Sequence, residues 1–129
     1  MPTNFDRTHE FCVFEYMYRD AGNWKTSGKL LMEGSSEGMQ PVLEAYLDWA
    51  NQFVAEQVGV PPLYERHFAD CGEGPSDLDH AFHEFIRLRP ATEEEQRDMT
   101  SHCRLPDFVT RMQKAAGRWD VTLSPYCDY

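Results

Sequence analysis

The sequence predicts an α+β fold in which a small antiparallel sheet packs against two to three helices. Two runs rich in aromatic and β-branched residues open the chain, and turn residues separate them, as in a hairpin. Amphipathic segments with helix-start and helix-stop residues follow, and a last run alternates apolar and polar residues. At 129 residues the chain has the length of one domain, so we expect a single α+β domain over residues 1–129.

The hairpin is expected over residues 10–34. Residues 10–19 carry apolar side chains on both faces of an extended chain, which is typical of an interior strand covered on both sides. Residues 20–23 are turn formers, and residues 24–34 have the composition of the returning strand.

Residues 40–57 have the clearest helical pattern of the chain. Pro41 suits a first turn, and Gly59 with Pro61 and Pro62 would end the helix. Apolar pairs recur every three to four residues: Val42 and Leu43, Tyr46 and Leu47, Trp49 and Ala50, Phe53 and Val54. They predict one buried helix face.

Residues 82–89 allow two interpretations. Ser76 and Asp79 have the spacing of a capping box, which would start a helix. Pro90 leaves little room for that helix, so we expect a strand preceded by a loop.

Three more elements complete the expected fold. Residues 92–100 begin with a capping box and predict a short helix. Pro106 and Gly117 bracket another helix. Residues 119–123 alternate as a half-buried final strand would. We expect these core residues to be mostly buried: Phe14, Tyr16, Leu31, Leu47, Trp49, Phe53, Phe85 and Ile86.

The chain is acidic, with 12 Lys and Arg against 22 Asp and Glu and a formal net charge of −10. Phosphate backbones are bound through Lys and Arg, and anionic lipids repel an acidic surface, so neither nucleic acid nor membrane is expected as a partner. Residues 1–7 lack the apolar stretch of a signal peptide, and no CxxC pair is present. These features predict a cytoplasmic protein with four reduced cysteines, Cys12, Cys71, Cys103 and Cys127.

Common enzyme signatures are missing from the sequence. It contains no GxxxxGK[ST], GxGxxG or GxSxG pattern. His83 and Glu84 begin like a zinc-protease helix, but Arg87 stands where the second histidine ligand belongs. Enzymatic activity is left open, and a non-enzymatic role is favoured.

Residues 65–84 combine six acidic residues with a single arginine and three of the five histidines. Imidazole and carboxylate together suit a divalent transition metal such as zinc, iron or manganese. The candidate ligands are Asp77, Asp79, His80 and His83, with His67 as an extra ligand. On a helix His80 and His83 would share a face, whereas on a strand they would point to opposite sides. The alternative is a solvated acidic loop that binds no metal.

A second candidate group, Tyr18, Arg19, Asn23 and Lys25, surrounds the hairpin turn. A guanidinium beside an ammonium group and hydroxyls could hold a carboxylate or phosphate ligand. The alternative is that Arg19 pairs with an acid such as Asp20 and that Asn23 serves the turn.

The pattern Tyr-x-Tyr-Arg-Asp-x-x-Asn-x-Lys-x-x-Gly over residues 16–28, with Asp-x-Asp-His-x-x-His-Glu-Phe over residues 77–85, resembles a family of small bacterial proteins of unknown function. The resemblance covers residues 12–100. It implies a bacterial cytoplasmic protein and no particular reaction, cofactor or ligand.

Three functions follow as alternatives. The first is a non-enzymatic module that binds a protein, a second copy of itself or a ligand, because Trp and Tyr often anchor interfaces. The second is a metal-binding protein or metal-dependent enzyme that uses the Asp77–Glu84 segment. The third is a DNA-mimic inhibitor, supported only by the net charge.

Overall fold

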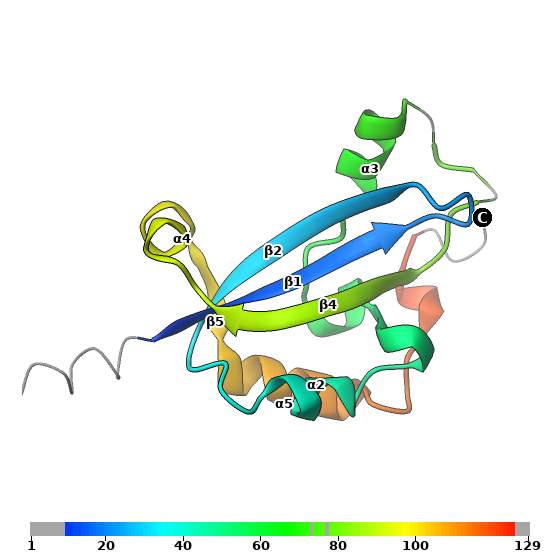
Figure 1. Ribbon diagram of the computed structural model, residues 1–129. Coiled ribbons are helices and arrows are strands. Elements are labelled where there is room, and N and C mark those ends of the chain that lie inside the picture. The colour runs from blue at the N-terminus through cyan, green and yellow to red at the C-terminus, as the bar shows by residue number, and fades with distance from the viewer. Residues whose placement is uncertain (1–9, 73, 77, 126–129) are drawn as a thin grey trace, which may run out of the picture.

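The computed structural model describes residues 10–72, 74–76 and 78–125. Within them, five strands form one curled, mostly antiparallel sheet in the order β3-β4-β1-β2-β5, accompanied by four α-helices (Figure 1). This architecture confirms the predicted α+β class.

The hairpin formed by β1 (Phe11–Arg19) and β2 (Lys25–Glu33) is confirmed, and the two strands pair along their whole length. β1 is the central strand, because β4 (Phe82–Pro90) pairs with its other edge. The side chains of even-numbered β1 residues are buried. On the opposite face Val13 is buried, whereas Glu15 is half-buried. The expectation that both faces of this strand are buried is therefore confirmed only for the first part of β1.

β4 confirms the expectation of a strand preceded by a loop. It pairs antiparallel with β3 (Gln52–Val54) as well as with β1. β5 (Ser101–Arg104) was not expected from the sequence. It runs parallel to β2 and pairs only with Leu31–Glu33, so the sheet is not purely antiparallel.

The long helix predicted over residues 40–57 is wrong. The segment folds as α2 (Gln40–Glu44), a 3₁₀ turn (Trp49–Asn51), strand β3 and a second 3₁₀ turn (Ala55–Val58). Here the pairing of β3 with β4 outweighs the helical pattern of the local sequence.

A left-handed turn explains where that prediction fails. Ala50 and Asn51 have φ angles of +60° and +58°, which no right-handed helix accommodates. The turn leaves Trp49 83% exposed, while Phe53 on β3 is fully buried. Leu47 is only partly buried.

The two shorter predicted helices are present. α4 (Glu93–Asp98) starts with the capping box of Thr92 and Glu95, and α5 (Leu105–Ala115) lies between Pro106 and Gly117 as expected. The strand predicted at residues 119–123 is wrong. A 3₁₀ turn replaces it, because the Asp120 carboxylate accepts from the N–H of Thr122 and closes the chain locally. No helix among the described residues is long and apolar enough to cross a membrane.

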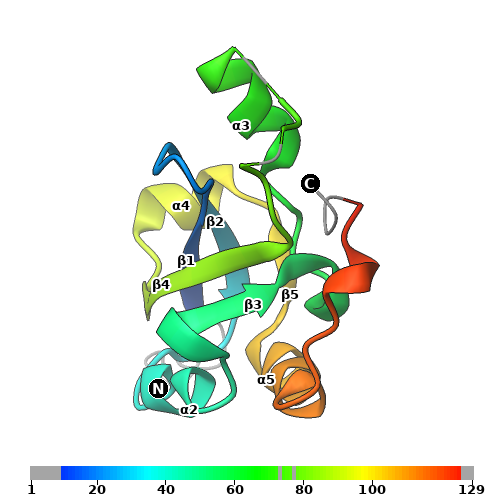
Figure 2. The ribbon, with the colours of Figure 1, turned by 90° about the vertical axis from the view of Figure 1, so that its right-hand side faces the viewer.

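The main core lies between the sheet and the side on which α2 and α5 are placed (Figure 2). The Phe14 ring is at its centre, with ring centroids 5.1 Å from Phe85 and 5.0 Å from Phe108. Ile86 was expected here but is 43% exposed. The register between β1 and β4 shifts at this residue, so Ile86 points to the open face of the sheet.

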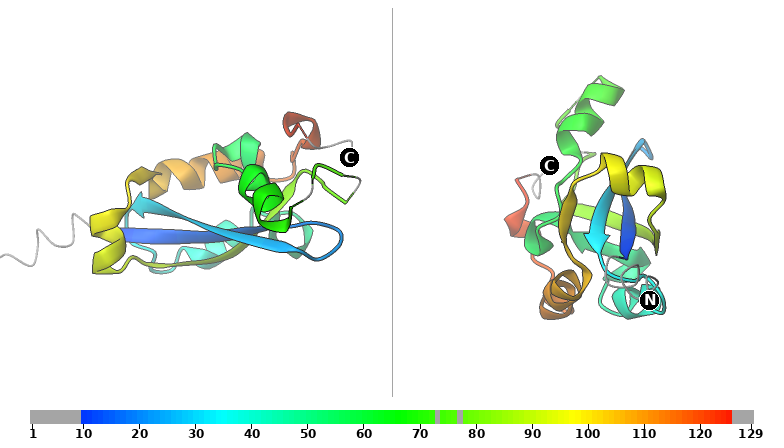
Figure 3. Two further views of the ribbon diagram at one scale, coloured as in Figure 1. Left: turned by 90° about the horizontal axis from the view of Figure 1, so that it is seen from above. Right: turned by 90° about the vertical axis from the view of Figure 1, so that its left-hand side faces the viewer.

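The remaining two helices lie near opposite ends of β2 (Figures 1 and 3). α4 is close to the start of β1, and α3 (Tyr64–Cys71) is close to the β1–β2 turn. This arrangement leaves the middle of β2 between them, where the candidate site lies.

Candidate functional site

The two groups predicted from the sequence meet at one end of the sheet, where the β1–β2 turn faces the loop before β4. Tyr18 Oη donates to Asp79 Oδ1 at 2.6 Å, and the backbone N–H of His80 donates to Tyr18 Oη at 3.2 Å. His80 Nε2 lies 2.7 Å from the carbonyl oxygen of Arg19. Since that oxygen can only accept, Nε2 carries the proton, and Nδ1 is free to accept from the N–H of Phe82 at 3.1 Å.

His67 joins the same end of the sheet through two hydrogen bonds. Its Nδ1 lies 2.8 Å from Thr26 Oγ1, and its Nε2 lies 2.9 Å from Asp20 Oδ2. Burial disfavours ionisation of Asp20, but the hydrogen bonds from His67 and from the N–H of Trp24 lower the pKa of this carboxyl below its ordinary value.

The Thr26 hydroxyl, the His67 imidazole and the Asp20 carboxylate are hydrogen-bonded in a row, an arrangement that resembles a catalytic triad. The Thr26 hydroxyl belongs to a residue that is only 4% exposed, and His67 is 1% exposed. A nucleophile must reach its substrate, so this series instead attaches α3 to the hairpin.

His83 is a neutral histidine inside the core. It is fully buried, and its Nε2 accepts from the N–H of Leu63 at 3.0 Å. Its Nδ1 has no hydrogen-bond partner among the described residues. Burial, followed by repulsion from His80 and His67, lowers the pKa of His83 to about 3. His83 therefore carries no charge near neutral pH.

The predicted metal ligands are engaged in these internal contacts. Asp79 also accepts from the N–H of Ser76 at 2.8 Å, and Asp77 lies outside the described residues. Within the described part of the chain, no group of three or more His, Cys, Asp or Glu side chains could hold a metal ion. The metal site stays a prediction.

Two of the three remaining residues of the hairpin group also serve internal contacts. Arg19 donates to Glu84 Oε2 at 3.0 Å and to Asn23 Oδ1 at 2.9 Å, so its acid partner is Glu84 rather than Asp20. Asn23 adopts a positive φ of 71° in the turn. Lys25 is exposed, and its side chain makes no ion pair with a described residue.

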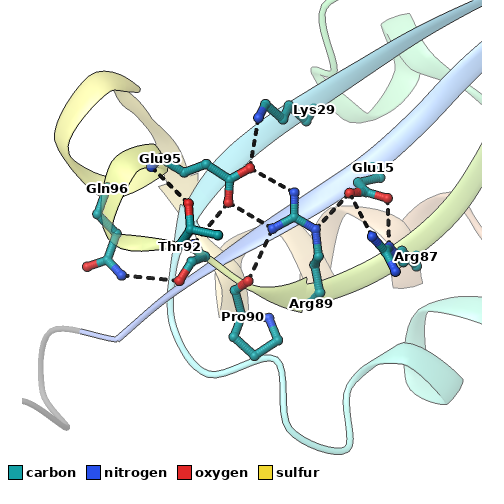
Figure 4. A network of polar contacts seen from close by, with 9 residues as sticks. Glu15, Lys29, Arg87, Arg89, Pro90, Thr92, Glu95 and Gln96 are labelled. Atoms are coloured by element: carbon teal, nitrogen blue, oxygen red, sulfur yellow. Dashed lines mark hydrogen bonds and ion pairs between the residues drawn. The ribbon is translucent and has the colours of Figure 1, made fainter.

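A ladder of alternating charges crosses the open face of the sheet (Figure 4). Glu15 pairs with Arg87 at 2.8 Å and with Arg89 at 2.7 Å. Arg89 also pairs with Glu95 at 2.7 Å, and Lys29 pairs with Glu95 at 2.8 Å. The hydrogen bonds from Arg89, and then from Lys29, lower the pKa of Glu95 well below its ordinary value. Each of these charges therefore has at least one partner of opposite sign.

A groove of about 630 Å³ opens beside this ladder, at β2. Its lining residues come from β1, β2, α3, β4 and the end of α4: Glu15, Tyr16, Ser27, Gly28, Lys29, Arg66, Ile86 and Met99. The volume is within the range of ligand sites in proteins.

The groove combines one unpaired cation with apolar surface. Arg66 is exposed and makes no ion pair with a described residue. Ile86 is 43% exposed, and Met99 is half-buried. A guanidinium beside apolar side chains can bind an anion that has an apolar body.

Gly28 lines the groove, and its lack of a side chain lets Leu63 and the Tyr16 ring pack closely against β2. A Cβ atom here would lie 2.9 Å from Leu63 Cδ2 and 3.2 Å from the Tyr16 ring. Burial raises the pKa of Tyr16 to about 12, although Arg66 opposes the shift. The Tyr16 hydroxyl therefore stays protonated and donates to the carbonyl oxygen of Pro61 at 2.7 Å.

Sequence reasoning did not find this groove. Two features could have indicated an exposed sheet edge at β2: Lys25 and Lys29 on one face of the strand, and Gly28 in its interior. Arg66 and Met99 reach the groove from other segments, and no local pattern places them there.

Comparisons with protein-family models, with curated proteins and with solved structures found no match to this chain. The function is therefore inferred from the geometry of the site.

Proposed function

We propose that this protein is a non-enzymatic binding module that holds an anionic, partly apolar ligand in the groove beside β2. The observation that carries the proposal is Arg66, an exposed cation without a counter-ion among the described residues, next to exposed apolar surface at Ile86. The net charge of −10 repels anions at long range, so the proposed binding depends on the short-range contact between the ligand and Arg66.

The titratable groups of the groove support binding rather than catalysis. Glu15 and Lys29 are held in ion pairs, and hydrogen bonds from Arg87 and Arg89 lower the pKa of Glu15 despite its partial burial. Tyr16 remains protonated because its pKa is raised to about 12. Glu15 and Tyr16 are therefore not poised to exchange a proton with a ligand near neutral pH.

A reducing compartment is consistent with the cysteines. Cys12 and Cys103 are free thiols. Free thiols are the usual state in the cytoplasm, so this observation supports a cytoplasmic location.

The proposal is tested with 8-anilinonaphthalene-1-sulfonate, a fluorescent anion with an apolar ring system. We expect saturable binding, with NMR shift changes at Ser27, Lys29, Arg66, Ile86 and Met99. Arg66→Gln and Ile86→Glu should each weaken binding about tenfold, because they remove the cation or add a repelling charge at exposed positions.

Arg118→Gln is the matched control. Arg118 is also exposed but does not line the groove, so this variant should bind like the unmodified protein. Equal affinity of the unmodified protein and both groove variants, or shift changes confined to other surfaces, would show that the groove is not the binding site.

A further inference from the structure

The outer edge of β2 is open over most of its length. β1 pairs with the whole of β2 from Lys25 to Glu33, whereas β5 pairs only with Leu31–Glu33. The edge over Lys25–Leu30 has no strand partner among the described residues. At about 3.3 Å per residue this edge is about 20 Å long, the length of an ordinary strand.

The neighbouring elements flank this edge without pairing with it. β5 pairs with β2 only from Leu31 onward. α3 approaches from the side of the main core, where Leu63 lies against Gly28 and His67 bonds to Thr26. Figure 3 shows β2 between α4 and α3. In an antiparallel pair, alternate residues direct their N–H and C=O groups away from the partner strand. The open edge therefore offers backbone donors and acceptors beside the groove.

The charged side chains near this edge indicate which kind of chain could pair with it. Lys25 and Lys29 are exposed on one face of β2, and Arg66 lines the groove together with Lys29. Two copies of the chain paired through this edge would bring these cations together, and like charges opposite one another destabilise strand pairing. An acidic segment would instead place carboxylates opposite the cations.

Resting on the proposed binding function of the groove, we propose that the Lys25–Leu30 edge takes up an extended acidic segment of a partner protein as an additional strand. Main-chain hydrogen bonds to the edge supply the register. The alternate side chains of the segment that lie over the groove carry carboxylates toward Arg66. The sheet then gains a sixth strand, placed beyond β2.

The probe is the peptide acetyl-Glu-Val-Glu-Val-Glu-Val-amide, labelled for fluorescence anisotropy and compared with its counterpart in which lysine replaces each glutamate. We expect the acidic peptide to bind at least about tenfold more tightly than the lysine peptide. Bound peptide should slow amide hydrogen exchange within Lys25–Leu30, because those outward N–H groups become hydrogen-bonded.

Backbone methylation of the peptide distinguishes strand pairing from simple charge attraction. One acidic peptide carries N-methyl groups at its first, third and fifth residues, and the other at its second, fourth and sixth. Only one of the two sets faces β2, so one peptide should lose binding by at least about tenfold while the other retains it.

Protein variants test the charges separately. The double variant Lys25→Glu with Arg66→Glu should lose at least about tenfold in affinity for the acidic peptide and gain affinity for the lysine peptide. Arg118→Glu, an exposed charge reversal off the groove, should leave both affinities unchanged.

The possible failures differ from one another. If both methylated peptides bind like the unmethylated one while 8-anilinonaphthalene-1-sulfonate still binds, strand addition is wrong and the binding function stands. If neither probe binds, both proposals fall. Concentration-dependent dimers whose exchange protection covers Lys25–Leu30 would make a second copy the occupant and overturn the proposal.

Discussion

Replacing His83 with glutamine should change how acid destabilises this protein. The His83 ring is fully buried, and its pKa falls from an ordinary 6.5 to about 3. Between these values the unfolded chain binds a proton that the folded chain refuses, so stability is highest above pH 6.5 and falls as the pH drops toward 3. At about 1.4 kcal/mol per pKa unit, the whole effect amounts to about 5 kcal/mol.

The glutamine variant should lose this dependence. Its side chain can still accept from the N–H of Leu63 but does not titrate. At pH 7 we expect His83→Gln to be less stable than the unmodified protein by about 1–3 kcal/mol, through imperfect packing. By pH 4.5 the stability difference should shift by about 2–3 kcal/mol in favour of the variant, which corresponds to nearly two pKa units of linkage.

Urea denaturation followed by tryptophan fluorescence at pH 7 and pH 4.5 measures both differences. Phe53→Leu is the control, because Phe53 lies in the same core with its ring centroid 6.1 Å from that of His83 and carries no titrating group. Its stability loss should be the same at both pH values. If the His83→Gln difference is also independent of pH, His83 does not exclude the proton and the assignment of a neutral core histidine is refuted.

Two further outcomes are expected. Glu95→Gln should lower the free energy of unfolding at pH 7 by about 2–4 kcal/mol, because it leaves Arg89 without its bidentate partner. The loss should shrink as the pH falls below 4.5, because Glu95 then binds a proton in the unfolded chain while it stays ionised in the folded protein. Urea denaturation measures both effects, and a loss that does not depend on pH would contradict the prediction. Thiol titration of the denatured, unreduced protein should find four reactive groups, and a count below four would show a disulfide. In the native protein Cys12 should react slowly, because burial, with a smaller contribution from Cys103, raises the pKa of its thiol to about 11.

The sequence by itself determined the elements whose signals are local. The hairpin follows from two apolar runs and a turn between them, and residues 10–34 fold as expected. The capping box of Thr92 and Glu95 predicts α4 because its hydrogen bonds join residues only three apart. In both cases the deciding contacts lie within a short stretch of chain.

The tertiary structure decided the elements whose apolar residues suit more than one conformation. Residues 40–57 fit a helix by spacing, yet β4 recruits Gln52–Val54 as a strand and Trp49 becomes exposed. The short β5 forms its strand pairing with Leu31–Glu33, about 70 residues away along the chain. Such pairings depend on residues far apart in the chain, which no local period encodes.

The candidate site, too, was determined partly by the sequence and partly by the tertiary structure. Tyr18, Asp79 and His80 were singled out by residue type, but only the fold shows that they bond to one another and that His83 is buried beside them. The groove was not foreseen, because Arg66 and Met99 reach it from separate helical regions. The chemical type of each residue is known from the sequence. Which residues lie close together, and which are buried, is decided only when the strands pair and bring distant segments of the chain together.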